Sequence, residues 1–250
     1  MLERRSRAVA LFDERYGLPA GRAREEELAT LASRFAELPY ENLTKIIALA
    51  EGGKLRGPEQ VMTEHLALGT GGTCFSLVEL LRSLASAAGF PCRPAMAHMR
   101  HGANIHCVLL CETASGTFVV DPGYLLPRPM PLAREAGAVK APRLGEARVV
   151  RAGSLGPVPA GIPDGELDLY TIEPEGPLWR YRIDPHPPTP AEFEAHWRAS
   201  FAMPAMRSLL CTRRTPGDEI LYLHNHKLRH RSAEGKRTEN VRAELCERVQ

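Results

Sequence analysis

Cys74 is the residue of this sequence best placed to do covalent chemistry. It follows the turn-forming segment 69–73 (GTGGT) and opens the apolar stretch 74–84, whose composition predicts a helix ended by Gly89 and Pro91. A thiol becomes a strong nucleophile as its thiolate, and a helix N-terminus favours that charged state. Cys74 is therefore a candidate nucleophile, able to hold an acyl group as a thioester.

A base and an orienting carboxylate for this thiol lie on a predicted β-hairpin. The hairpin joins the β-like runs 104–111 and 117–121 through Ser115 and Gly116. His106 lies on the first run and Asp121 ends the second, so the carboxylate can hold one ring nitrogen while the other faces Cys74. Taken singly, the three are also typical of a buried thiol, a hydrogen-bonded strand histidine and a turn-forming aspartate. Only their combination predicts a Cys-His-Asp triad.

Helical patterns surround Cys74, and strand patterns surround the other two residues. The spacing of apolar residues predicts helices over 23–36, 59–68 and 74–84. Among frequent Pro and Gly residues, further strands are predicted at 147–151, 168–173 and 179–183. A helix over 190–200 and strands over 207–213 and 219–224, joined by the turn 216–218, form a mixed tail. The order predicts helices, then a small barrel or open sheet, then a mixed tail.

Composition and charge restrict the classes of function. The chain has 250 residues, of which 44% are hydrophobic and 25% charged, values typical of a folded globular protein. A net charge of +2, with Arg and Glu mixed throughout, argues against nucleic acid as a partner. The run Lys227–Arg231, with Lys236 and Arg237, is the local exception: it could meet an anionic ligand such as a nucleotide phosphate, or be a solvated face.

The N-terminal residues and the cysteines indicate an intracellular protein. Residues 1–15 mix charges with a short apolar stretch and lack the apolar centre of a secretory signal, and no apolar run could span a bilayer. We therefore expect a cytoplasmic protein without a membrane partner. Six cysteines without a CxxC pair are expected to be free thiols, at positions 74, 92, 107, 111, 211 and 246.

The sequence segments around the three triad residues resemble those of the arylamine N-acetyltransferase family. Segment 38–43 (LPYENL) resembles its Pro-Phe-Glu-Asn-Leu motif, and 71–75 (GGTCF) its Gly-Gly-x-Cys-Phe motif. Segment 106–110 (HCVLL) is similar to its His-x-Val-Leu-Leu strand, and 119–124 (VVDPGY) to its Val-Asp-Val-Gly-Phe corner. With His196, Trp197 and the segments 201–212 and 221–228, the resemblance runs from about residue 24 to about residue 230.

This resemblance implies an α+β fold in three parts. A helical domain with the nucleophile would span 1–90, a central antiparallel β-barrel with His106 and Asp121 would span 91–189, and an α/β lid would span 190–250. It also implies a catalytic core like those of papain-like and transglutaminase-like enzymes. Such enzymes use acetyl-CoA as co-substrate, with no permanently bound cofactor, and acetylate aromatic amines, hydrazines or hydroxylamines. The implied partners are thus an acyl-CoA and a small-molecule amine.

Aromatic residues near the motifs are candidates for substrate contact. Tyr40 and Tyr124 occupy aromatic positions of the family's acceptor pocket, and Phe75 follows the nucleophile. The two tyrosines could equally pack in the core. The sequence departs from the family pattern at Thr70, where the family has Arg, and at Ser76, Leu77-Val78 and Pro122-Gly123-Tyr124.

Other functions remain open on the same residues. The triad is also compatible with a cysteine hydrolase, a transglutaminase-like enzyme or an amide synthase, and the departures with a binding module that has lost catalysis. A metal site could use His98, His101, His106, Cys107 and Cys111, but the two cysteines are oddly spaced for tetrahedral zinc, so we expect no metal. His224 and His226 alternate on one predicted strand and are expected to be exposed polar residues. The sequence leaves the oligomeric state and the acceptor undetermined.

Overall fold

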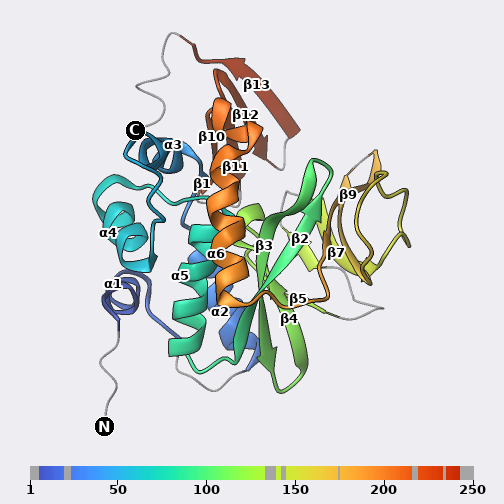
Figure 1. Cartoon of the computed structure of the whole chain (residues 1–250), viewed down its shortest axis with the longest axis horizontal. Helices are drawn as coiled ribbons and strands as arrows, with labels where there is room; N and C mark the ends of the chain where they lie inside the picture. Colours follow the sequence, from blue (N-terminus) through green and yellow to red (C-terminus); the bar gives the residue numbers. More distant parts are fainter. Residues whose placement is uncertain are drawn as a thin grey trace.

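Helices form the first third of the chain (Figure 1). The structure, a computed structural model, describes residues 6–19, 24–132, 139–141, 145–173, 175–215, 219–232 and 235–242. The helices of this region are α1 (Arg7–Tyr16), α2 (Glu25–Phe35), α3 (Leu43–Ala50), α4 (Pro58–Leu68) and α5 (Cys74–Ala87). The three helices that the apolar spacing predicts are therefore confirmed. Helices α1 and α3 were not predicted individually.

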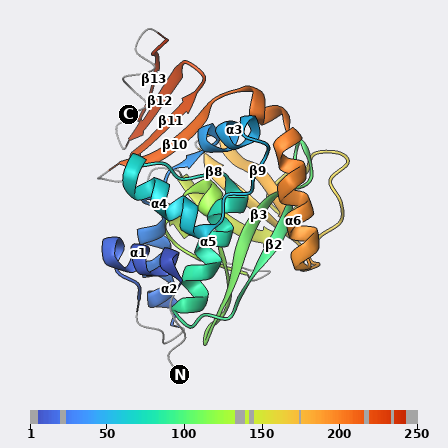
Figure 2. The same cartoon turned by 60° about the vertical axis from the view of Figure 1, so that its left-hand side comes forward.

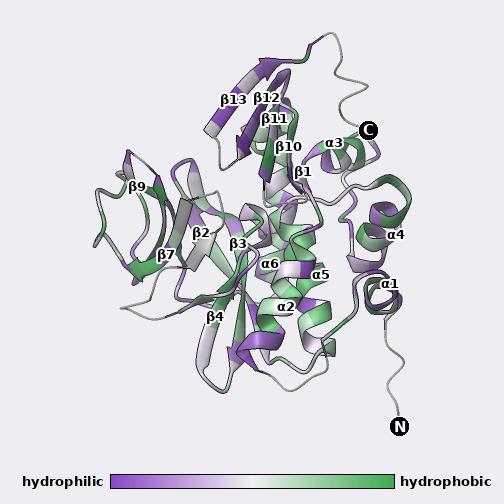
Figure 3. Cartoon of the chain, turned by 180° about the vertical axis from the view of Figure 1, so that it is seen from behind, coloured by the Kyte–Doolittle hydropathy of each residue, from purple (hydrophilic) through white to green (hydrophobic). Residues whose placement is uncertain are grey.

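Helix α5 is the centre of the helical region. Leu77, Leu80, Leu81 and Leu84 are fully buried and, at spacings of three and four residues, lie on one side of it. Helices α1, α2 and α4 contact it, and so do strands of the following sheet. Figure 3 shows hydrophobic residues gathered on α5 and α2. Nine of the fourteen residues of α5 are buried, which fixes the position of its first residue, Cys74.

An eight-stranded antiparallel sheet follows. Its strands are β2 (Cys92–Met99), β3 (Gly102–Thr113), β4 (Gly116–Val120), β5 (Met130–Pro131), β6 (Val139–Ala141), β7 (Gly145–Arg151), β8 (Leu167–Glu173) and β9 (Gly176–Ile183). Their order is β5-β4-β3-β2-β9-β8-β7-β6. Met130 near one edge shares a core with Ala147 and Val149 near the other, so the sheet curls on itself like a barrel. The predicted hairpin is confirmed as β3 and β4.

Strand β3 separates two cores. Cys107, Leu109 and Cys111 belong to the core shared with the helices, whereas Val108 and Leu110 belong to the interior of the curled sheet. This is the alternation of a strand buried on both faces. It places successive residues of β3 on opposite sides of the boundary between the helical and the β region.

The last part of the chain combines one helix with a second sheet (Figure 2). Helix α6 (Pro190–Ala199) begins with a capping box of Thr189 and Glu192. The 3₁₀ turns η2 (Ser200–Ala202) and η3 (Pro204–Arg207) follow it. The sheet has the order β1-β10-β11-β12-β13. Because β1 (Tyr40–Glu41) belongs to the helical region, the sheet connects that region with the last part of the chain. Its other strands are β10 (Leu210–Thr215), β11 (Glu219–His224), β12 (Lys227–Ser232) and β13 (Gly235–Asn240).

Three details differ from the sequence-based expectations. The strand expected from residue 207 begins at Leu210, because Pro204–Arg207 form η3. His226 lies in the turn after β11 and does not share a strand with His224. Strands β12 and β13 were not predicted, because charged residues mask their alternation. The predicted turn 216–218 and Cys246 lie outside the described residues. No described helix is long and apolar enough to cross a membrane.

Candidate active site

Cys74 is the first residue of α5 and is 5% exposed. The backbone N–H of Leu77 donates to the carbonyl oxygen of Thr73, the N-cap residue, so the N–H groups of the residues between them lie at the open start of the helix. No acidic residue lies in the first turn. Gly71 is required just before it, since a Cβ there would lie 1.8 Å from the backbone oxygen of Pro39. The close approach of β1 therefore positions the thiol at an unblocked helix N-terminus.

His106 and Asp121 form a buried pair. His106 Nε2 lies 3.1 Å from Asp121 Oδ2, and the two residues are 4% and 0% exposed. The register of β3 and β4 explains this contact: Leu109 pairs with Val120, so Asp121 lies diagonally across from His106. With Nε2 occupied, Nδ1 is the ring nitrogen left for the hydrogen bond with Cys74. The structure thus brings the three predicted residues together.

Asp121 is held by more donors than the sequence indicated. Its Oδ1 accepts from the backbone N–H groups of Gly123 at 2.8 Å and Tyr124 at 3.2 Å, and its Oδ2 accepts from Tyr181 Oη at 2.8 Å. The two amide groups belong to the 3₁₀ turn η1 (Pro122–Tyr124), for which Asp121 is the N-cap. The departure from the family's corner motif, Pro122-Gly123-Tyr124, is therefore the turn that fixes the carboxylate.

The electrostatics of the site favour a thiolate and an imidazolium. A hydrogen bond with the Cys107 thiol holds the pKa of Cys74 well below its usual value, against the effect of burial. A hydrogen bond with His106 and the positive charges of His106 and Lys45 lower this pKa further. Burial lowers the pKa of His106, but Asp121 and Cys74 outweigh it and raise this pKa to about 10. At neutral pH the two side chains therefore form an ion pair.

Cys107 supports the charge on Cys74. Burial, together with the hydrogen bond to Cys74, raises the pKa of the Cys107 thiol well above its usual value. Cys107 thus stays protonated, and its S–H group donates a hydrogen bond to the neighbouring thiolate. In the sequence Cys107 was one of six expected free thiols and a residue considered for a metal site, with no part assigned in the triad. Strand alternation turns Cys107 towards the helical core, and this pattern is the signal that could have placed it near Cys74.

Tyr181 on β9 is a positioning residue that the sequence did not reveal. It is fully buried, and its ring centroid lies 4.9 Å from that of His106. Because its hydroxyl donates to a charged carboxylate, we expect Tyr181→Phe to lower the second-order rate of Cys74 acylation about tenfold. Rapid-quench acylation measured against pH checks this. Tyr170→Phe is the matched control: it removes another buried hydroxyl, which donates to Gly156 O at 3.0 Å. Equal losses in both variants would contradict a positioning role.

The three candidate contact residues have different surroundings. Tyr124 is half-buried, and its ring packs edge-on against His106 at 5.7 Å. Tyr40 is half-buried and bridges to Gly72; burial and the charge of Cys74 raise its pKa well above 10. Phe75 is 1% exposed and packs on Phe193 and Trp197 of α6. Phe75 therefore anchors α6 in the core, whereas the two tyrosines border the triad.

Lys45 on α3 places a buried cation near the thiol. It is 6% exposed; its Nζ donates to Ser200 Oγ and lies 4.8 Å from the centroid of Phe201. Burial lowers the pKa of Lys45 to about 8, against the opposing effect of the negative charge on Cys74. No motif indicated this lysine, because its neighbours come from a segment about 155 residues later in the chain.

Arg56 supports the turn that leads into Cys74. Its Nη1 donates to Gly71 O at 3.1 Å and to Thr44 Oγ1 at 2.5 Å, and its Nε donates to Glu64 at 2.9 Å. Thr44 in turn donates to Glu41 at 2.6 Å. The chain thus has a buried arginine on this turn although Thr70 replaces the arginine of the family motif.

The residues considered for a metal site are dispersed. His98 accepts from Asn104 N at 3.2 Å and lies 3.7 Å from Asp184, while His106 is engaged by Asp121. Cys107 and Cys111 face the helical core. Over the described ranges, no group of three His, Cys, Asp or Glu residues could hold a metal ion.

Comparison with known proteins agrees with this geometry. The family model described as N-acetyltransferase matches residues 26–249. Arylamine N-acetyltransferase from Salmonella typhimurium has a TM-score of 0.77 at 21% identity, over 95% of this chain and 86% of that one. Arylamine N-acetyltransferase C from Bacillus anthracis has a TM-score of 0.77 at 16% identity, over 98% and 97%. The Mycobacterium smegmatis enzyme has a TM-score of 0.78 at 17% identity, over 96% and 89%.

These likenesses to solved structures show the fold, and the family model shows the family. No curated protein sequence matches the chain. The match to the family model covers nearly all of the chain, including the segments that contain Cys74, His106 and Asp121. The chain therefore belongs to the arylamine N-acetyltransferase family, and it is an acyltransferase.

Proposed function

We propose that the protein transfers an acetyl group from acetyl-CoA to a small amine through an acyl-Cys74 intermediate. The observation that supports this most is the buried triad, in which Cys74 lies at a helix start and contacts a His106 that Asp121 holds. The Cys74 thiolate attacks the thioester carbonyl, and amide groups at the start of α5 stabilise the oxyanion. The carbon–sulfur bond to CoA breaks, and the CoA thiolate takes the proton of the His106 imidazolium.

The second half of the cycle uses the neutral imidazole. An arylamine, hydrazine or related amine attacks the acyl-Cys74 carbonyl while His106 removes its proton. The thioester bond breaks, which restores the Cys74 thiolate and the His106 imidazolium. The donor product leaves before the acceptor reacts, so the kinetics are ping-pong. No permanently bound cofactor takes part.

We further propose that the three expected segments divide this work. Segment 1–90 provides Cys74 and segment 91–189 provides His106 and Asp121, so the triad lies where the two meet. Segment 190–250 acts as the lid. Two contacts support this role: α6 packs on Phe75, and Ser200 accepts from Lys45.

Intact-mass spectrometry after incubation with acetyl-CoA tests the proposed function. We expect one acetyl adduct on the wild type and none on Cys74→Ala. Cys92→Ala is the control that should keep the adduct, because Cys92 is, among the cysteines that the structure describes, the other thiol with a lowered pKa, of about 7, through its hydrogen bond with Cys111. Amines should discharge the adduct far faster than water does. Rapid discharge by water alone would indicate a hydrolase, and no adduct with any acyl-CoA would indicate a binding module.

A further inference from the structure

Two free thiols outside the triad lie directly opposite each other on neighbouring strands. Cys92 is the first residue of β2, and the strand register pairs it with Cys111 of β3. The backbone N–H of Glu112 donates to Pro91 O at 2.8 Å, so the adjacent residue pair is the hydrogen-bonded one and the cysteine pair is not. In a pair of the second kind the Cα atoms are about 4.5 Å apart, within the range of about 4.4 to 6.8 Å that a disulfide spans.

Both thiols lie on the side of the strands that faces helix α5. Cys111 is fully buried in the core shared with the helices, and Cys92 packs against that core. Cys92 Sγ lies 3.4 Å from Ser86 Oγ and 3.7 Å from the carbonyl oxygen of Arg82, both near the end of α5. A hydrogen bond joins the two thiols to each other. The two sulfur atoms are therefore close enough to bond without a rearrangement of the strands.

The two thiols differ in reactivity. The hydrogen bond with Cys111 lowers the pKa of Cys92 to about 7, against the effect of burial, and Ser86 and the charge of Arg82 lower it as well. Cys92 is half-buried, so a small oxidant can reach it. The same hydrogen bond, together with burial, raises the pKa of Cys111 well above its usual value. An accessible thiolate beside a protonated second thiol is the arrangement of an oxidisable cysteine and its resolving partner.

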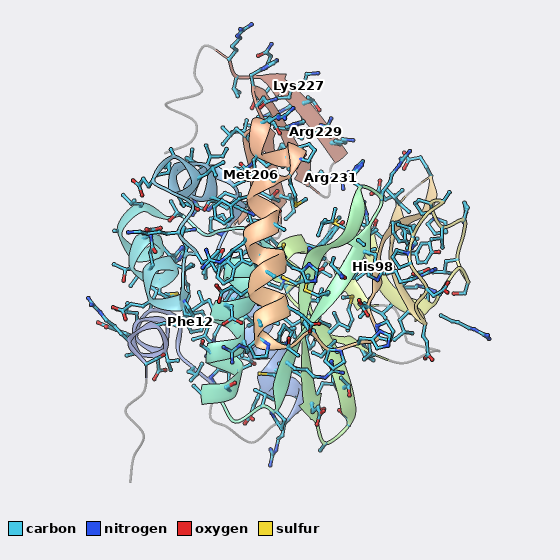
Figure 4. The ribbon with its side chains drawn as sticks, viewed as in Figure 1. Phe12, His98, Met206, Lys227, Arg229 and Arg231 are labelled. Atoms are coloured by element: carbon cyan, nitrogen blue, oxygen red, sulfur yellow. The ribbon has the colours of Figure 1, made fainter. Side chains whose placement is uncertain are left out.

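The thiol pair is distant from the triad along two elements. Cys74 begins α5, whereas Ser86 lies in the last turn, about 18 Å further along the helix. Strand β2 begins beside that last turn (Figure 1). His106 pairs with Ala97, about 17 Å along β2 from its first residue. His98, labelled in Figure 4, is the neighbour of Ala97 near that opposite end of β2. Oxidation of the thiol pair is therefore separable from chemistry at Cys74.

We propose that Cys92 and Cys111 are a modification site at which a peroxide forms a cross-strand disulfide and a dithiol reductant reverses it. The Cys92 thiolate attacks one peroxide oxygen, the O–O bond breaks, and the leaving oxygen takes up the proton that the Cys92 thiol released. The sulfur of Cys111 then attacks the sulfur of the Cys92 sulfenic acid. The S–O bond breaks, and hydroxide leaves with the Cys111 proton as water. The two thiols together lose two electrons, which reduce one peroxide.

Peroxide treatment of Cys74→Ala tests this proposal without the triad thiol. Hydrogen peroxide should lower the mass of this variant by about 2 Da, the loss of two hydrogen atoms, and dithiothreitol should restore it. After alkylation of free thiols and trypsin digestion, the segment 83–100 should be linked to the segment 101–134. Cys74→Ala/Cys111→Ala should show no link, which separates Cys111 from Cys107. The control Cys74→Ala/Cys211→Ala should keep the link, because burial raises the pKa of the Cys211 thiol to about 11 and its strand partner is Leu223.

Two further measurements keep the proposal falsifiable. Oxidised Cys74→Ala should melt about 5 °C higher than its reduced form, because the disulfide closes a loop of about 20 residues. In Cys74→Ala/Cys111→Ala, dimedone should trap a sulfenic acid on Cys92, since the resolving thiol is absent. An unchanged mass, oxygen addition without a link, or a link that persists without Cys111 would overturn the proposal. A lower melting temperature on oxidation would show that the strands are not arranged for the bond. These proteins lack Cys74, so none of the results depends on acyl transfer.

Discussion

Asp121→Asn is expected to lower the acylation rate of Cys74 by roughly three to four orders of magnitude, as the loss of the orienting carboxylate does in other triads. Asp121 raises the pKa of His106 to about 10, and its Oδ2 accepts a hydrogen bond from His106 Nε2 at 3.1 Å. Asparagine has no charge, so the pKa of His106 falls. The imidazolium that stabilises the Cys74 thiolate is then lost near neutral pH, and the pKa of Cys74 rises.

The pH dependence of thiol alkylation measures this effect directly. In the wild type, the ion pair exists above the lowered pKa of Cys74 and below the pKa of His106, which is about 10. Alkylation by iodoacetamide should therefore change little across neutral pH. In Asp121→Asn it should rise with pH as an ordinary thiol does. An unchanged alkylation profile in a folded variant would contradict the role given to Asp121.

Gly123→Ala is expected to lower turnover about a hundredfold, because a shift of about 1 Å in a reacting group has effects of that size. A Cβ at Gly123 would lie 2.7 Å from His106 Cε1, 3.2 Å from Asp121 Oδ1 and 3.5 Å from Cys74 Cβ. A Cβ at this position would therefore contact all three members of the triad. The added methyl group has to push the imidazole away from Cys74 or from Asp121.

Steady-state kinetics and thermal unfolding separate this displacement from a loss of folding. Gly156→Ala is the matched control, since a Cβ there meets its nearest heavy atom, Tyr170 Cε1, at the ordinary distance of 3.9 Å. We expect similar melting temperatures for both variants and a loss of kcat in Gly123→Ala alone. Full activity of Gly123→Ala would show that the turn after Asp121 yields without moving His106.

The sequence by itself predicted the local structure that places the triad. The glycines before Cys74 and the apolar stretch after it put the thiol at the start of α5. The alternation of β3 and the turn at Ser115-Gly116 set the hairpin that brings Asp121 to His106. Such features depend on neighbours close in the chain, so residue order is enough to predict them. The family motifs added the relation between Cys74 and the hairpin.

Only the tertiary structure decided which other residues serve the site. Tyr181 reaches Asp121 from 60 residues away, and Lys45 meets Ser200 from 155 residues away. The pairing of β1 with β10 sets Tyr40 in one row with Thr212, Tyr222 and Arg229, although these residues lie far from it in the chain. Contacts of this kind depend on how the sheets and helices pack, because no local pattern of residues encodes which distant strands become neighbours.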